Sequence, residues 1–133
     1  MRASWGILGL VLTQLAYADF DQSESWQLAC SGDTYTSTTG EEQTISRFNK
    51  RSVVLTFSGD HTDIRYEDGY PVRAVRTESH YRARTSGDTQ NWQLIHLEHE
   101  SLDISVTTFT SLPDQRHRSV RFRGNCQVTD PVT

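Results

Sequence analysis

The feature that most constrains the fold is the alternation of residue types along residues 102–112. Leucine, isoleucine, valine and threonine occupy every second position there, and mostly polar residues lie between them. Because a strand sends successive side chains to opposite faces of a sheet, this period of two predicts a half-buried strand. Shorter runs of the same kind cover residues 51–58 and 62–67. Residues 92–99 are apolar at positions of both faces, which predicts a strand near the centre of a sheet.

Turn signals separate these runs at short intervals. Glycine or proline accompanies aspartate in four segments, namely 58–60, 67–71, 86–88 and 112–115. Many short strands with close turns, and no sustained apolar stripe at helical spacing, predict an all-β antiparallel fold. We expect a small β-barrel of six to eight strands, lipocalin-like, or a related sandwich. The chain shows no internal repeat or linker, so residues 19–133 are expected to form a single domain.

The first eighteen residues predict a secretory signal peptide. Arg2 precedes an apolar run that ends before Ala16-Tyr17-Ala18, which puts small residues at the two positions that signal peptidase reads. The run is too short and wrongly flanked for a membrane span. We therefore expect cleavage after Ala18 and a mature protein that is secreted or periplasmic.

The two cysteines of the chain, Cys30 and Cys126, are expected to form a disulfide in such an oxidising compartment. Apolar residues lie two positions away from each of them, so both cysteines fall on the apolar face of their strands. They can pair if the first and last strands are neighbours, as in an up-and-down barrel. Closing so long a loop contributes about 4–5 kcal/mol in the chain-entropy model. Gly124 is expected to relieve crowding or to mark a bulge at this closure.

The charge of the chain argues against one class of partner and suggests another. The formal net charge is −4, and it becomes one unit more negative without Arg2. Nucleic-acid binding requires a clustered basic surface, so we expect no nucleic-acid partner.

Arginines nevertheless gather in two segments, residues 73–84 and 116–123. The first group lies along a long polar strand that we expect over residues 71–85. If these segments lie close together, they form a positive stripe that can dock a carboxylate- or phosphate-bearing partner. The alternative is a charged outer face that is partly paired with glutamates. The candidate binding residues are Arg73, Arg76, Arg82, Arg84, Arg121 and Arg123.

The sequence offers no clear motif for catalysis. The densest group of potential metal ligands is 96–100, but a strand sends His96 and Glu98 to one face and His99 to the other. A zinc site would therefore need His61 or His80 as well. The turn at residues 59–63 does not have the spacing of a calcium loop. Neither a nucleophile elbow nor a glycine-rich phosphate loop is present. We expect no catalytic residue, no metal and no cofactor.

The layout is similar to that of small exported bacterial β-proteins. It consists of a signal peptide, aromatic-x-x-x-Cys-x-Gly from Trp26 to Gly32, and Phe-x-Gly-x-Cys from Phe122 to Cys126. Periplasmic lysozyme inhibitors are one such group, with an eight-stranded barrel, a disulfide and a Ser-Gly-x-x-Tyr inhibitory loop. Residues 31–35 resemble that motif, but they follow the first cysteine directly, which is not its expected place. The chain is therefore not assigned to that family.

Three hypotheses of function follow. The leading one is an exported, non-enzymatic binding module of the cell envelope, such as an inhibitor or immunity-type protein, which engages a protein partner or a charged ligand. A lipocalin-like carrier of a small apolar ligand is the alternative, and it requires that Trp26, Phe57, Trp92 and Phe122 leave space inside the barrel. A small hydrolase or metal enzyme is the third, and it requires that the histidines cluster.

Overall fold

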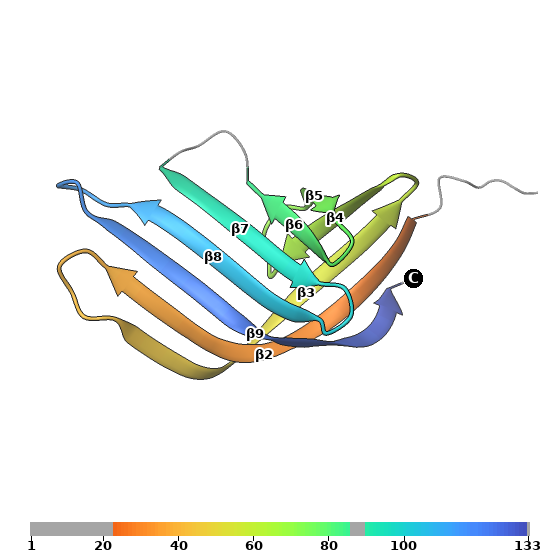
Figure 1. Ribbon diagram of the computed structural model, residues 1–133, viewed down its shortest axis with the longest axis horizontal. Helices are drawn as coiled ribbons and strands as arrows, with labels where there is room; N and C mark the ends of the chain where they lie inside the picture. The colour runs from red at the N-terminus through yellow and green to blue at the C-terminus, as the bar shows by residue number, and fades with distance from the viewer. Residues whose placement is uncertain (1–22, 86–89, 133) are drawn as a thin grey trace, which may run out of the picture.

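The chain forms a closed antiparallel β-barrel of eight strands (Figure 1). The computed structural model describes residues 23–85 and 90–132, so the predicted signal peptide and the predicted turn at 86–88 lie outside the described residues. Each strand pairs with the next along the chain, and β9 returns to pair with β2. The prediction of an all-β barrel is confirmed, and its eight strands are the upper limit of the expected six to eight. The strands are β2 (Ser23–Thr38), β3 (Thr44–Ser58), β4 (His61–Tyr66), β5 (Val72–Arg76), β6 (His80–Arg84), β7 (Asn91–Glu98), β8 (Asp103–Ser111) and β9 (His117–Val132).

The wall of the barrel is uneven, because the strands differ greatly in length. β2 and β9 have 16 residues each, whereas β5 and β6 have five. Figure 1 shows the long strands extending past the short ones, so that β7, β8, β9 and β2 form a broad curved sheet on one side. No helix in the described ranges is long and apolar enough to cross a membrane.

The apolar core lies inside the barrel and follows the predicted alternation. Ile104 and Val106 of β8 are 3% and 2% exposed, and their neighbours in sequence face outward. Two aromatic pairs occupy the interior, with ring centroids 6.2 Å apart for Phe57 and Tyr81. The second pair is formed by Tyr66 and Phe122, at 6.5 Å. Burying a large apolar side chain contributes about 1.5–3 kcal/mol, so this core supplies most of the stabilisation. The buried residues of the core are Leu28, Cys30, Val53, Leu55, Ile64, Ala74, Tyr81, Ala83, Ile95, Leu97, Ile104, Val106, Phe122 and Cys126.

Towards the β2–β3 turn, the inner face of the barrel becomes polar. Thr38 is buried and accepts a hydrogen bond from Nε of Arg118 at 3.2 Å. Gln93 donates its side-chain amide to the hydroxyl of Thr108, also at 3.2 Å. Buried polar groups are costly unless they are hydrogen-bonded, and these pairs meet that requirement. One half of the interior is therefore apolar and the other is lined with hydroxyl groups.

The seam between β2 and β9 is exceptionally close. Cys30 and Cys126 are direct cross-strand partners and form the predicted disulfide. In the next inward-facing pair, a Cβ at Gly32 would lie 2.0 Å from the carbonyl oxygen of Arg123. A Cβ at Gly124 would lie 2.3 Å from the carbonyl oxygen of Ser31. The prediction that Gly124 relieves crowding is confirmed, and Gly32 is required for the same reason.

Several predicted strand limits were wrong, and β3 begins at Thr44 instead of near residue 51. Residues 71–85 form the hairpin of β5 and β6 instead of one long strand. The hydroxyl of Thr77 accepts hydrogen bonds from the backbone N–H groups of Ser79 and His80, at 3.3 and 3.1 Å, and thereby stabilises a turn. Leu102 lies outside β8, with a φ of 60° that a regular strand does not accommodate.

Replacing Gly124 by alanine should destabilise the fold by about 2–3 kcal/mol, because the added methyl group meets backbone atoms that cannot swing away. Urea unfolding of the variant measures this loss. Gly69→Ala is the matched control, since its Cβ would meet only the carbonyl oxygen of Tyr66, at 3.1 Å. Equal midpoints for Gly124→Ala and the control would contradict the close approach of β2 and β9.

Reducing the disulfide of the otherwise unchanged protein should lower the free energy of unfolding by about 4–5 kcal/mol. The physical reason is the sequence separation of 96 residues, because a long loop gains much entropy in the unfolded chain when the cross-link is opened. Guanidinium unfolding with and without reductant measures the difference. Unchanged stability after complete reduction would show that the barrel closes without help from the cross-link.

Candidate functional site

The outer face from β6 to β2 carries two rows of residues that continue from strand to strand. Directly opposed residues of antiparallel strands share a face, so the register alone assigns each row. Two strands, β7 and β8, separate the arginines of β6 from those of β9, a span of about 14 Å at the usual strand spacing. The first row runs Arg82, His96, Ser105, Arg123, and the second runs Arg84, Leu94, Thr107, Arg121.

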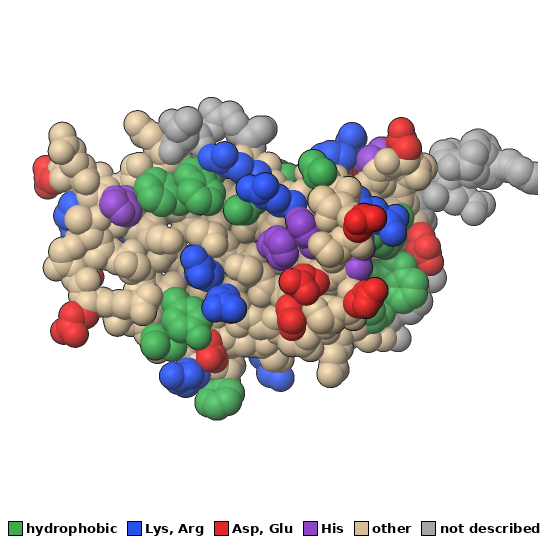
Figure 2. Space-filling model, in the orientation of Figure 1, with side chains coloured by type: hydrophobic (Ala, Val, Ile, Leu, Met, Phe, Trp, Pro, Cys, Tyr) green, Lys and Arg blue, Asp and Glu red, His purple; other side chains and the backbone are tan. Residues whose placement is uncertain are grey.

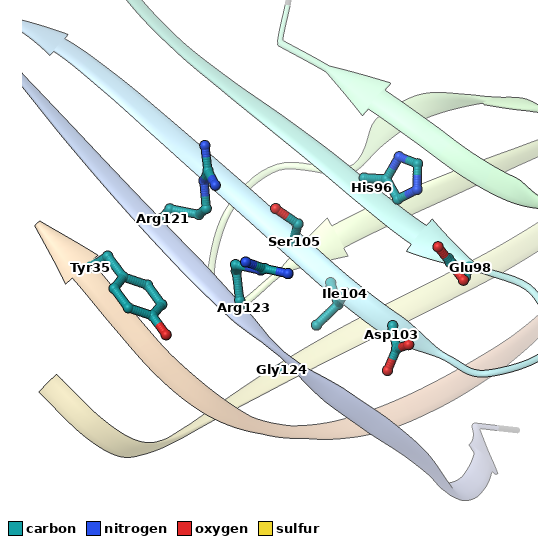
Figure 3. Close-up of a pocket in the computed structure, with 9 residues that line it drawn as sticks. All are labelled: Tyr35, His96, Glu98, Asp103, Ile104, Ser105, Arg121, Arg123 and Gly124. Atoms are coloured by element: carbon teal, nitrogen blue, oxygen red, sulfur yellow. The ribbon is translucent and has the colours of Figure 1, made fainter. Parts of the chain in front are cut away.

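Figure 2 shows this face, with basic side chains in separate groups and histidines between two of them. Beside the arginines of β9 lies an open groove of about 800 Å³ (Figure 3). Ser105 of β8 lies at its floor, His96 and Glu98 of β7 form one wall, and Arg121 and Arg123 form the other. Figure 3 shows both arginine side chains extending toward β8. A groove of this size accommodates a short peptide segment or a small ligand.

A second groove lies on the opposite side of the same two arginines. It has a volume of about 390 Å³, and none of the described residues that line it is acidic. Arg121 and Arg123 therefore stand as a ridge between two hollows and contribute to both. Hydroxyl and amide groups complete the second groove, from Tyr35, Ser37, Gln43 and Ser119.

The guanidinium groups of Arg121 and Arg123 form no ion pair or hydrogen bond with a described residue. Asp33 is the cross-strand neighbour of Arg123, but its carboxylate is turned to β3. There it accepts from Nη1 of Arg47 and from the backbone N–H of Phe48, both at 3.2 Å. Asp33 therefore forms no ion pair with Arg123.

The acidic residues across the first groove accept hydrogen bonds from uncharged side chains next to them. Asp103 accepts from the side-chain amide of Asn125 at 2.9 Å. Glu98 accepts from the hydroxyl of Ser101 at 3.1 Å. The groove therefore has a positive wall at β9 and a negative end near Asp103. An occupant would match it best with a carboxylate at the arginines and a hydrogen-bond donor at the acidic end.

The remaining predicted arginines are separated from this ridge. Arg73 of β5 forms an ion pair with Asp63 of β4 at 3.5 Å. The guanidinium of Arg76 lies 5.9 Å from the ring centroid of Tyr81. Arg82 and Arg84 of β6 lie on the same outer face as Arg121 and Arg123 of β9, but β7 and β8 separate the two pairs. The single predicted stripe is thus divided, and only Arg121 and Arg123 are brought directly together with a groove on either side.

A row of stacked rings flanks the arginines on the same face. Trp92 stacks on Phe109 with centroids 5.4 Å apart, and Phe109 stacks on His117 at 5.3 Å. The guanidinium of Arg84 lies over Trp92 at 5.0 Å. Cross-strand aromatic pairs stabilise a sheet, so this row stiffens the extended part of the wall. Sequence reasoning missed it, although Phe109 at a polar position of the alternation was an available signal.

His80 and His96 stack next to the first groove, with ring centroids 4.1 Å apart. Burial lowers the pKa of His96 below its ordinary value, and the nearby charges of His80 and Arg82 act in the same direction, against Glu98. Nδ1 of His80 lies 3.0 Å from the hydroxyl of Ser79. His96 is therefore expected to be mostly neutral at pH 7.

The other histidines do not join this pair. His99 packs against Tyr81, on the opposite face from His96 and Glu98, as the strand pattern predicted. His61 lies near Asp60 and Asp63, and its hydrogen bond to Asp60 is the main cause that lowers the pKa of that carboxyl. Within residues 23–85 and 90–132, no three histidine, cysteine, aspartate or glutamate residues are placed to hold one metal ion.

Comparison with protein-family models, with curated proteins and with solved structures found no match. The function is therefore argued from the geometry of the outer face.

The pKa of His96 should lie below the ordinary value of about 6.5, and His80→Asn should raise it. In the wild-type protein, a lowered pKa of His96 means that the unfolded state binds more protons than the folded state. The free energy of unfolding should therefore fall as the pH drops through about 6.5. NMR titration gives the pKa, and urea midpoints at neutral and mildly acidic pH give the stability. His96→Gln should weaken this pH dependence. A His96 pKa at or above the ordinary value would contradict the effect assigned to burial.

Proposed function

We propose that the chain is an exported, non-enzymatic binding protein of the cell envelope that engages an acidic protein partner. Its binding face is centred on Arg121 and Arg123 of β9. The observation that carries this proposal is the absence of any described ion-pair partner for two adjacent arginines that stand between two grooves. On a chain with a net charge of −4, such a local positive site favours one orientation of an acidic partner.

The arrangement of these arginines suits protein recognition. Each guanidinium can bind a carboxylate through two parallel hydrogen bonds, which gives orientation as well as attraction. Both side chains come from a strand that is paired on both sides, with β2 and β8. Their backbone is therefore ordered before binding, so less entropy is lost when the partner docks.

The location is inferred from two features of the chain. Residues 1–18 have the pattern of a signal peptide, and the Cys30–Cys126 disulfide is consistent with an oxidising compartment. A stable exported domain with a preformed binding face fits an inhibitor or an immunity-type protein. Such a protein acts by covering its target and needs no catalytic group of its own.

The interior gives less support to a carrier of apolar ligands. Phe57, Tyr81, Tyr66 and Phe122 occupy the apolar half, and their rings lie close to one another. The other half presents hydroxyl groups and Arg118, which an apolar ligand would have to desolvate. Trp92 lies outside, on the stacked row. The separation of the histidines likewise gives no support to a hydrolase.

Affinity capture with matched variants tests the proposal. The wild-type protein should enrich one partner from an extract of its host's envelope, and Arg121→Glu with Arg123→Glu should weaken that binding at least about tenfold. Arg65→Glu with Arg76→Glu is the charge-matched control on β4 and β5, and it should bind as the wild type does. Rising salt should weaken the wild-type complex.

Two results would overturn the proposal. One is a partner that binds the Arg121 and Arg123 variant as tightly as the wild type. The other is repeated failure of the wild-type protein to enrich any partner under conditions in which it stays folded.

A further inference from the structure

Phe48 of β3 combines two unfavourable properties. Its side chain is 88% exposed, and its backbone has a φ of 62°. A bulky residue other than glycine is rare in the left-handed region, because its Cβ approaches the backbone too closely. Its ring makes no aromatic or cation–π contact with a described residue. Neither core packing nor local backbone preference explains a phenylalanine at this position.

The surrounding structure holds Phe48 in this conformation. The pairing of β2 and β3 shifts between Gly32 and Thr34, so that Arg47 and Phe48 together oppose Asp33 in a β-bulge. The carboxylate of Asp33 binds both of them, the side chain of Arg47 and the backbone N–H of Phe48.

Asn49 secures the other end of the bulge. Its side chain accepts a hydrogen bond from the hydroxyl of Thr34 and donates one to Ser46 at 3.0 Å. The bulge is thus fixed by side-chain contacts from both strands. Strain that is maintained by such dedicated contacts is characteristic of functional positions.

The bulge adjoins the binding face of the proposed function. Ile45 of β3 is 46% exposed and pairs with Tyr35 of β2, which in turn pairs with Arg121 of β9. Only β2 therefore separates Ile45 and Phe48 of β3 from the arginine ridge of β9. Figure 2 shows apolar and basic side chains interspersed at the lower edge of this face. The side chains of Lys50, Arg121 and Arg123 form no ion pair with a described residue, so the surroundings of Phe48 carry free positive charge.

We propose that Phe48 is the anchor by which this protein holds its partner. The partner is an acidic peptide segment of another protein, whose large apolar side chains pack on the ring of Phe48 while its carboxylates bind the arginine ridge. An exposed aromatic residue with arginines at its border has the composition of an interface hot spot. The inference rests on the proposed function, because it assigns a second part of the same interface.

Because the backbone of Phe48 is strained, a substitution there can separate an effect on binding from an effect on stability. Phe48→Gly removes the ring and also relieves the positive φ, so the variant should be at least as stable as the wild type. It should nevertheless lose binding at least about tenfold. Phe48→Asn is a second variant that tolerates the same backbone. Tyr70→Ser is the matched control, because Tyr70 is 91% exposed in a turn away from this face, and its loss should change neither quantity.

The probe is a phage-displayed library of random peptides, selected on the immobilised wild-type protein. Enriched peptides should carry net negative charge and at least one large apolar residue. Their affinities are then measured by fluorescence polarisation against each variant. Loss of binding to Phe48→Gly, with binding to Tyr70→Ser intact and unfolding midpoints unchanged or raised, is the expected result.

The outcomes separate the two proposals. Peptides that need Arg121 and Arg123 but bind Phe48→Gly normally would overturn the anchor and leave the proposed function standing. Peptides that need Phe48 but not the arginines would overturn the arginine ridge as the centre of the binding face. A selection that enriches no acidic peptide above background would overturn the anchor, whereas the affinity capture with the arginine variants decides the proposed function separately.

Discussion

β2 and β9 approach so closely at Gly32 and Gly124 that neither position has room for a Cβ atom, and the adjacent Cys30–Cys126 pair is joined by a disulfide. This seam closes the barrel and determines which residues of the two strands face each other. A slip of one residue would send every side chain of β9 to the other face. The outward position of Arg121 and Arg123 therefore depends on a pair of glycines and a pair of cysteines on the inward face.

The bulge between β2 and β3 explains why Arg123 stays unpaired although a carboxylate lies opposite it. Asp33 follows Gly32 and lies opposite Arg123, where it could neutralise that charge. Because the next strand is bulged, the carboxylate of Asp33 binds the bulge at Phe48 instead. One local irregularity thus leaves Arg123 free and exposes a strained aromatic ring. The strained backbone at Phe48 costs stability, and natural proteins retain such costs mainly where function requires them.

The sequence predicted the features that follow from the alternation of apolar and polar residues and from the two cysteines. The alternation along residues 102–112 located β8, and the two inward cysteines predicted the closure of the first strand on the last. What it missed depends on contacts between distant residues. Phe48 has the pattern of an ordinary strand residue, and its φ follows from Asp33, fifteen positions earlier. The division of the arginine stripe was missed because the turn at Thr77 is made by a side-chain hydroxyl rather than by glycine or proline.

We infer that β9, β2 and the bulge of β3 form one binding face. Hydrogen exchange of the protein with and without its captured partner tests this most directly, because exchange slows where a partner covers the backbone. We expect slower exchange within residues 31–50 and 119–125, and unchanged rates at residues 59–76. Protection confined to residues 59–76, with β9 and the bulge unaffected, would show that the partner binds a different face of the barrel.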